Sequence, residues 1–80
     1  MSIRLIVVDD HPVVLRGLQT LFVGSEFEIV AEASSAEQAY QLANSVEADV
    51  LLLDIRMPDG DGLECLSRLK QETPDLAVLI

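Results

Sequence analysis

The sequence predicts an α/β fold built around one parallel sheet. Strand-like and helix-like patterns alternate along the chain with short connections between them, which is the signature of βαβ units. Two runs of four apolar residues, 5–8 and 50–53, are each followed directly by aspartate. Such runs are typical of strands that are buried on both faces of a parallel sheet. The 80 residues, half of them apolar, are enough for one small domain.

The first third of the chain predicts a strand, a helix and an edge strand. Residues 4–9 form the first strand, and Pro12 suits the first turn of a helix because its missing N–H has no partner to lose there. One face of this helix carries apolar side chains at helical spacing: Val14, Leu15, Leu18, Leu21 and Phe22. Gly24 ends the helix. Residues 27–33 alternate between apolar and polar side chains, which indicates an edge strand with one wetter face.

The middle of the chain predicts a second helix and a central strand. Ser35 and Gln38 form a capping-box pair at the start of the helix. The apolar stripe of this helix consists of Ala36, Ala39, Tyr40, Ala43 and Val46. Residues 49–54 are apolar at four consecutive positions, so we expect helices to cover both faces of this strand.

The last third predicts a helix and a fourth buried strand. Asp61 and Glu64 form another capping pair, and the helix ends at Thr73-Pro74. Its apolar stripe consists of Leu63, Leu66 and Leu69. Residues 76–80 read as a strand at which the chain stops, so we expect a fragment of a longer domain. We also expect this exposed edge to pair with a second copy, or an element to be exchanged between two copies, to give a homodimer.

The composition excludes several classes of function. Five basic residues against fourteen acidic ones give a formal charge of −9, which argues against direct nucleic-acid binding. The amino terminus has too short an apolar run for a signal peptide or a membrane span, so we expect a cytoplasmic chain without membrane contact. Cys65, the single cysteine, lies at an apolar helical position and is expected to fill the core rather than to act as a nucleophile.

Three carboxylates follow the two apolar runs. Asp9 and Asp10 come after the first run, and Asp54 comes after the second. If the two strands lie side by side and parallel, these side chains meet at the edge of the sheet where open α/β folds bind ligands. Mutual repulsion then calls for a divalent cation, and Mg²⁺ prefers oxygen ligands. Asp54, the lone acid after the central strand, is the candidate nucleophile toward a phosphoryl group.

Each of these elements also has a simpler interpretation. The pair Asp9-Asp10 can serve as a helix cap with a solvated neighbour, and residues 59–62, Asp-Gly-Asp-Gly, fit a turn followed by a cap. His11 is expected to be a polar loop residue rather than a metal ligand, and Arg56 to screen Asp54. The conjunction of an acidic pair after one strand and a lone aspartate after another favours a shared site.

Three other kinds of site fit the residues less well. A dinucleotide-binding turn needs G-x-G-x-x-G after the first strand, whereas residues 9–12 are acidic there. A calcium loop that starts at Asp54 needs glycine and glutamate where Asp59 and Cys65 stand. A haloacid-dehalogenase-type phosphatase needs an acid two residues after its nucleophile, at the position of Arg56.

Three segments resemble the receiver domain of bacterial two-component response regulators. They are residues 7–12 (Val-Val-Asp-Asp-His-Pro), 52–58 (Leu-Leu-Asp-Ile-Arg-Met-Pro) and 61–64 (Asp-Gly-Leu-Glu). The Asp-Asp-His-Pro start, followed by Val-Leu-Arg-Gly-Leu, is similar to the NarL/FixJ branch in particular. The resemblance implies a flavodoxin-like, doubly wound sheet of order 2-1-3-4-5. Residues 1–80 would hold the amino-terminal portion, with four strands (2-1-3-4) and three helices.

The resemblance also implies a function. Asp54 would accept a phosphoryl group from a sensor histidine kinase, and Mg²⁺ would be held by Asp9, Asp10, Asp54 and the backbone carbonyl of Arg56. The chain would act as a phosphoacceptor rather than as an enzyme.

The family's switch Ser/Thr and its Lys would both fall after Ile80, so we expect phosphorylation of this fragment to be weak. DNA binding and control of transcription would belong to a carboxy-terminal helix-turn-helix domain of the parent protein. The alternative is a truncated or stand-alone receiver that works only through protein contacts, without being phosphorylated.

Overall fold

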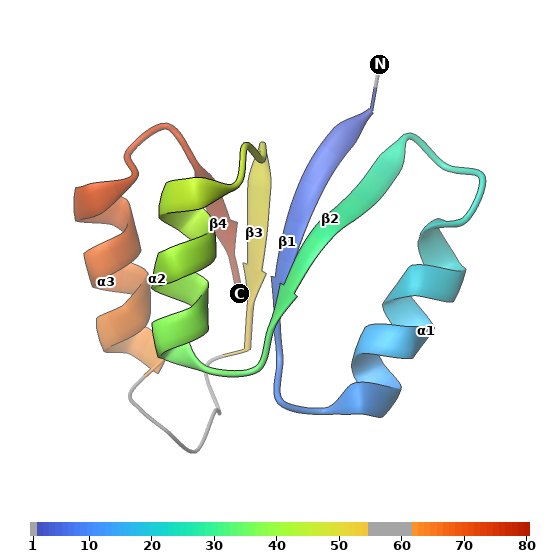
Figure 1. Cartoon of the computed structure of the whole chain (residues 1–80), viewed down its shortest axis with the longest axis horizontal. Coiled ribbons are helices and arrows are strands. Elements are labelled where there is room, and N and C mark those ends of the chain that lie inside the picture. The colour runs from blue at the N-terminus through green and yellow to red at the C-terminus, as the bar shows by residue number, and fades with distance from the viewer. Residues whose placement is uncertain (1, 55–61) are drawn as a thin grey trace.

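The computed structural model describes residues 2–54 and 62–80 and contains one four-stranded parallel sheet with helices on both of its faces (Figure 1). The elements in chain order are β1 (Ile3–Val8), α1 (Pro12–Phe22), β2 (Phe27–Ala33), α2 (Ala36–Ser45), β3 (Val50–Leu53), α3 (Gly62–Glu72) and β4 (Ala77–Leu79). The strand order is β2-β1-β3-β4, and every pair is parallel. The predicted fold class and strand order are confirmed.

The first two helices begin and end largely as predicted. Pro12 occupies the first turn of α1, and Gly24, just beyond its end, has a φ of 78°. At the start of α2, Ser35 Oγ accepts a hydrogen bond from the backbone N–H of Gln38 at 3.2 Å. Gln38 Oε1 accepts in turn from the backbone N–H of Ser34 at 2.8 Å. The side chain of Gln38 therefore reaches back one residue further than the usual capping box.

The third helix packs two of the three residues of its predicted stripe, Leu66 and Leu69, against the core, but not the first, Leu63. Its expected cap, Asp61, lies outside the described residues, but the helix ends at Glu72 as predicted, and Thr73 Oγ1 donates to the carbonyl of Leu69. Leu63 is exposed, whereas Cys65 and Leu69 are fully buried. Positions four apart stay on one face of a helix better than positions three apart, which drift around it. The prediction for Leu63 is wrong, and that of a buried Cys65 is confirmed.

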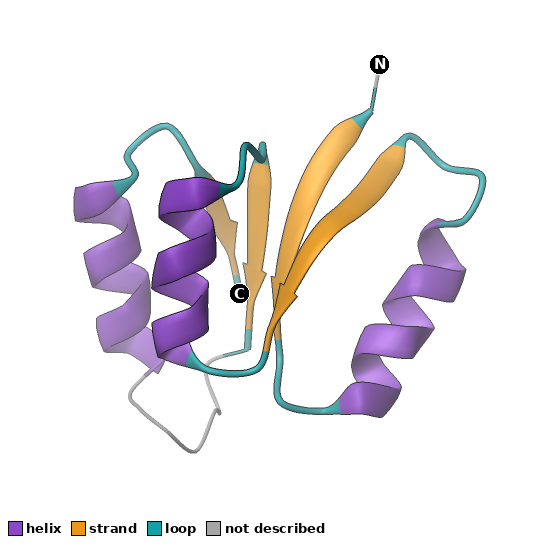
Figure 2. Ribbon diagram, viewed as in Figure 1, coloured by secondary structure: helices purple, strands orange, loops and turns teal. Residues whose placement is uncertain are grey.

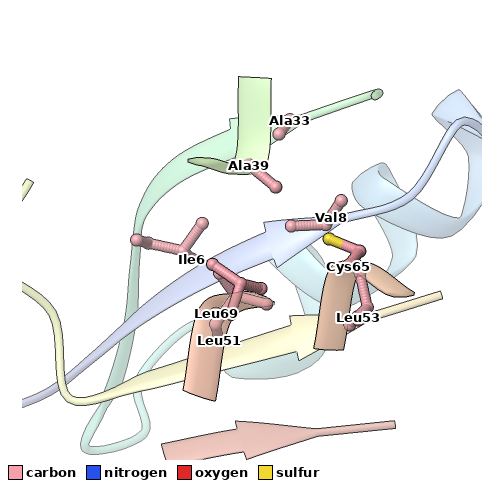
Figure 3. Packing of buried hydrophobic residues seen from close by; sticks show 8 residues of the cluster. All are labelled: Ile6, Val8, Ala33, Ala39, Leu51, Leu53, Cys65 and Leu69. Atoms are coloured by element: carbon pink, nitrogen blue, oxygen red, sulfur yellow. The ribbon is translucent and has the colours of Figure 1, made fainter. Parts of the chain in front are cut away.

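The main core lies between the sheet and the pair α2 and α3, which Figure 2 shows on one side of the strands with α1 on the other. The buried side chains come from three strands and these two helices (Figure 3): Ile6, Val8, Ala33, Ala39, Leu51, Leu53, Cys65 and Leu69. The predicted stripe of α2 packs against this cluster. Each buried leucine or isoleucine contributes about 1.5–3 kcal/mol, so this face anchors the fold.

The opposite face of the sheet is covered unevenly. Leu5 and Val7 of β1 are buried there, but Leu52 of β3 is half-buried and Leu79 of β4 is exposed. The expectation that helices cover both faces of residues 49–54 is therefore wrong for the described part of the chain. The helix α1 does not cover β3 because it packs toward the edge strand β2. Gln19 of α1 donates a hydrogen bond to Glu32 of β2 at 2.7 Å.

The first helix itself buries less than its pattern predicts. Leu15, Leu18 and Phe22 are half-buried, whereas Val14 and Leu21 are exposed, and no residue of α1 is fully buried. Of the five apolar side chains predicted to share one helical face, Val14 and Leu21 therefore remain exposed, because α1 contacts the described part of the chain mainly through β2.

The edge strand β2 has the predicted half-polar pattern. Ala33 is buried and Ile29 is half-buried, while Glu28 and Glu32 are exposed. The register with β1 shifts by one residue after Ile29, which leaves Val30 outside the ladder as a bulge. None of the helices in the described ranges is long and apolar enough to cross a membrane.

Candidate acidic site at the carboxyl edge of the sheet

The parallel register of β1 and β3 brings the two acidic segments together. Val8 pairs with Leu53, and the ladder continues for one step because the backbone N–H of Asp54 donates to the carbonyl of Val8 at 2.9 Å. On the other side of β1, the N–H of Asp9 donates to the carbonyl of Ala33, also at 2.9 Å. Backbone hydrogen bonds thus hold the ends of both strands in place as far as Asp9 and Asp54, which carry the carboxylates.

The turn between β1 and α1 folds His11 back over the acidic side chains. Asp9 Oδ1 accepts from the backbone N–H of His11 at 2.8 Å and lies 2.7 Å from its ring nitrogen Nδ1. The same Nδ1 lies 2.9 Å from Asp10 Oδ1 and 3.7 Å from Asp54 Oδ2. Three carboxylates and one imidazole therefore form one cluster.

This arrangement corrects two of the simpler interpretations. The residue that caps α1 is His11, without a side-chain hydrogen bond, so the pair Asp9-Asp10 does not cap the helix. His11 is exposed, as expected of a loop residue, but its ring belongs to the site. The sequence signal for the cap was Pro12, because a proline in the first helical turn makes the preceding residue the cap.

The charge of the cluster acts on the imidazole. The hydrogen bond with Asp9 and the negative charge of Asp10 raise the pKa of His11 above its ordinary value, although partial desolvation opposes them. When the ring is protonated, its positive charge offsets part of the repulsion between the carboxylates.

The carboxylates also offer ligand atoms to a cation. One oxygen from each of Asp9, Asp10 and Asp54, together with a nitrogen of His11, lie within 4.8 Å of one another. Asp10 Oδ1 is shielded from solvent and accepts no hydrogen bond from any described residue. His11 Nδ1 is near it, but a single N–H points at one acceptor, and Asp9 Oδ1 is closer. A shielded oxygen in need of a partner fits a hard cation such as Mg²⁺.

The remaining predicted ligand cannot be placed. The backbone carbonyl of Arg56 lies outside the described residues, as do the turn at 59–62 and its predicted cap. The structure therefore brings together three of the four predicted metal ligands and adds His11 to them.

Comparison with known proteins identifies the fold and the family. Residues 5–80 match the family model of the response regulator receiver domain. DevR/DosR, a DNA-binding transcriptional activator of Mycobacterium tuberculosis, is 40% identical over 79 residues, which cover 98% of this chain and 36% of that protein. The response regulator protein VraR of Staphylococcus aureus is 35% identical over 81 residues, covering 100% of this chain and 39% of VraR. The chain spans well under half the length of these relatives.

Solved structures agree with this match. The isolated REC domain of RcsB from Salmonella enterica serovar Typhimurium, studied with the phosphomimetic BeF3⁻, has a TM-score of 0.88 and 27% identity, covering 98% of this chain and 59% of that one. A LuxR-family response regulator from an Aurantimonas species has a TM-score of 0.87 and 29% identity, covering 98% and 56%. With the family model matched over nearly the whole chain and the acidic cluster at the expected edge of the sheet, this chain belongs to the receiver domains of two-component response regulators.

Proposed function

We propose that Asp54 accepts a phosphoryl group from a sensor histidine kinase while Mg²⁺ is held at the acidic cluster, defined as Asp9, Asp10 and Asp54. The observation that carries this proposal is the convergence of these carboxylates from two strand ends, with Asp10 Oδ1 shielded from solvent and without a hydrogen bond from the described residues. Such an oxygen favours a cation in its vicinity.

The ligand roles follow from how each carboxylate is held. Asp10 and Asp54 would bind the metal directly, whereas Asp9 would stay nearby because its Oδ1 already accepts from the backbone of His11. The carbonyl of Arg56 is proposed from the family resemblance alone. Mg²⁺ typically keeps several waters and uses one or two carboxylates together with a phosphate oxygen, so this small cluster suits it better than a full protein cage would.

The phosphoryl transfer uses one carboxylate oxygen of Asp54 as nucleophile. That oxygen forms a new bond to phosphorus, and the bond between phosphorus and the donor nitrogen of a phosphohistidine breaks, with its electron pair leaving on the imidazole. The strand ladder up to Asp54 N–H holds the nucleophile in place. When bound, Mg²⁺ supplies positive charge that neutralises the transferring oxygens.

The chain on this proposal is an acceptor, not an enzyme that turns over a substrate. A kinase draws its phosphoryl group from cytoplasmic nucleotide, so we place this step in the cytoplasm. In a longer parent protein, phosphorylation would control a carboxy-terminal helix-turn-helix domain that binds DNA and regulates transcription. The name of DevR/DosR, a DNA-binding transcriptional activator, supports this output.

The second candidate is a receiver that acts only through protein contacts and is never phosphorylated. It is favoured by the uncovered apolar face of the sheet, which offers a contact surface independent of the acidic cluster. The two candidates differ in whether Asp54 gains a covalent group.

The test is incubation with Mg²⁺ and a small acyl-phosphate donor, followed by intact mass measurement. We expect a longer parent protein to gain one alkali-labile phosphoryl group and the 80-residue chain to gain it far more weakly, and we expect both Asp54→Asn and removal of Mg²⁺ with a chelator to abolish the gain. Asp49→Asn is the matched control, because it makes the same chemical change at the opposite end of the same strand segment and should leave labelling intact.

Equal labelling of the chain and of Asp54→Asn would remove Asp54 from the mechanism. No labelling of the folded parent protein, under conditions in which Mg²⁺ binds, would favour the contact-only receiver instead.

A further inference from the structure

His11 brings a nitrogen atom into the acidic cluster. Its ring nitrogen Nδ1 lies 2.9 Å from Asp10 Oδ1 and 3.7 Å from Asp54 Oδ2. In the described ranges, these residues and Asp9 are the one group of three or more His, Cys, Asp or Glu side chains whose ligand atoms all lie within 4.8 Å of one another. The single cysteine is buried in the core. We therefore expect a metal titration of this chain to report on this site.

The distances around Nδ1 suit a tetrahedral ion. Zn²⁺ binds nitrogen and carboxylate oxygen at about 2.0–2.2 Å, so neighbouring ligand atoms of a tetrahedral site are about 3.3–3.6 Å apart. The distances from Nδ1 to Asp10 and Asp54, 2.9 and 3.7 Å, lie on either side of this range. Side-chain shifts of a few tenths of an ångström would bring both distances into it.

Backbone hydrogen bonds hold His11 in this position. Its N–H donates to Asp9 Oδ1 at 2.8 Å, and its carbonyl accepts from the N–H of Val14 at 3.0 Å. The strand ladder holds Asp54 in the same way. The nitrogen and oxygen ligands are therefore placed before an ion binds, which lowers the cost of ordering them.

A hydrogen bond with Asp9 alone does not account for the surroundings of the ring. Nδ1 lies 2.7 Å from Asp9 Oδ1, and one N–H satisfies one acceptor. Oxygens of Asp10 and Asp54 also face this nitrogen, and Asp10 Oδ1 accepts no hydrogen bond from the described residues. When the ring hydrogen is on Nε2, Nδ1 has a lone pair for an ion. The side chain of His11 is 57% exposed, so an ion reaches it from solvent.

A nitrogen ligand changes which cation the site prefers. Mg²⁺ takes oxygen ligands, keeps several waters and gains little from an imidazole. Zn²⁺ binds imidazole and carboxylate together, and it commonly has three protein ligands and a fourth position for water. Two carboxylates and one imidazole therefore suit Zn²⁺ better than the carboxylates alone would.

From this ligand set we propose that His11 determines the metal specificity of the site, because its Nδ1 joins Asp10 and Asp54 in binding Zn²⁺, whereas Mg²⁺ does not use the ring. Asp9 stays outside the coordination sphere and holds the backbone of His11. This role of His11 rests on the proposed function, since Zn²⁺ would occupy the oxygens assigned there to Mg²⁺. Zn²⁺ would thus compete with Mg²⁺ and with phosphoryl acceptance at Asp54.

The test is a pair of affinity measurements on the chain at neutral pH without a phosphoryl donor. Competition with a chromophoric chelator gives the Kd for Zn²⁺, and backbone amide NMR shifts give the Kd for Mg²⁺. We expect His11→Gln to raise the Kd for Zn²⁺ by about tenfold or more, because a ligand is lost. The same variant should change the Kd for Mg²⁺ by less than about threefold, because Mg²⁺ does not use the ring.

Two carboxylate variants complete the comparison. Asp10→Asn should weaken the binding of both ions, because both use its oxygen. Asp49→Asn makes the same chemical change at the opposite end of the β1–β3 pair and should weaken neither. Circular dichroism verifies that each variant is folded.

A direct readout comes from the ring itself, because His11 is the only histidine of the chain. In the ¹⁵N-labelled chain, saturating Zn²⁺ should shift the ring resonance of Nδ1 far more than that of Nε2. A purely structural role of His11 would not produce this selective shift.

Three results would overturn the role of His11. They are an equal affinity for Zn²⁺ in the chain and in His11→Gln, tighter binding of both ions in that variant, and an Nδ1 resonance that stays unchanged when Zn²⁺ saturates the chain. If Mg²⁺ binding persists in any of these cases, the proposed magnesium site survives. Zn²⁺ binding through His11 in a chain that does not bind Mg²⁺ would contradict the magnesium site and support the role of His11.

Discussion

The carboxylates at the two ends of the β1–β3 pair differ in how they are paired. At the amino-terminal end, the backbone N–H of Arg4 donates to Asp49 Oδ2 at 2.8 Å. The Arg4 guanidinium lies 3.6 Å from the same oxygen and 3.4 Å from Glu47 Oε1. The pKa of Asp49 is lowered, first by the backbone hydrogen bond from Arg4. Here the chain neutralises its own carboxylates.

At the carboxyl-terminal end, three carboxylates converge with His11 as the partner that the structure places among them. Asp10 Oδ1 accepts no hydrogen bond from the described residues. The same pair of strands thus has one end at which the carboxylates are paired with Arg4 and one end at which three carboxylates offer ligand atoms to a cation. A shielded carboxylate oxygen that accepts no hydrogen bond is a reason to look for a ligand, whereas a hydrogen-bonded one is not.

The largest expected difference between the two ends is their response to Mg²⁺. At a hundredfold excess over its dissociation constant, Mg²⁺ should stabilise the fold by about 2.7 kcal/mol, and thermal melts measure this as a rise in Tm. Asp10→Asn should abolish the rise, whereas Asp49→Asn should retain it. A magnesium-dependent rise that survives in Asp10→Asn would show that the ion binds elsewhere.

Without metal, the two substitutions should act in opposite directions. Asp10→Asn removes one of three mutually repelling charges and should raise the free energy of unfolding by about 1 kcal/mol. Asp49→Asn removes a charge that Arg4 already compensates and should lower it. Urea unfolding in the presence of a chelator measures both changes. If the two variants lose stability to the same extent, repulsion at the carboxyl edge is not significant.

The smallest expected effect is the pH dependence at the amino-terminal end, because Asp49 is exposed and screened by solvent. Its pKa is lower in the folded than in the unfolded chain, where the ordinary value is 3.8. Its stabilising contribution is therefore complete above the unfolded-state pKa and disappears as the pH falls through the folded-state pKa.

We expect the stability difference between the chain and Asp49→Asn to be constant from about pH 5 to pH 7 and to shrink below about pH 4. Urea unfolding at several pH values measures it. A difference that grows on acidification would contradict the assignment of a lowered pKa to this pair.

The sequence was sufficient for the order of the elements and for the convergence of Asp9, Asp10 and Asp54. An apolar run that ends in aspartate predicts both features: the run marks a buried strand, and the aspartate marks the edge of the sheet at which the strand ends. Turn and cap residues such as Pro12 and Ser35 located the helix starts for the same reason: their chemistry is local.

Contacts between elements were harder to predict. The pattern of α1 predicts five core residues, but how far a helix sits from a sheet depends on the neighbouring strands, and Leu21 remains exposed. In α3 the choice between Leu63 and Cys65 depends on the rotation of the helix, which periodicity alone does not determine. The position of the His11 ring depends on the conformation of a turn, which hydrophobic periodicity does not predict.

The most direct measurement is to locate the phosphoryl group. After incubation of the longer parent protein with Mg²⁺ and an acyl-phosphate donor, borohydride reduction converts a phosphorylated aspartate to homoserine, and peptide sequencing identifies its position. We predict homoserine at position 54 and unchanged aspartate at positions 9, 10 and 49. Homoserine at position 9 or 10, or at none of these positions while Mg²⁺ is bound, would contradict the proposal that Asp54 is the phosphoacceptor of this receiver.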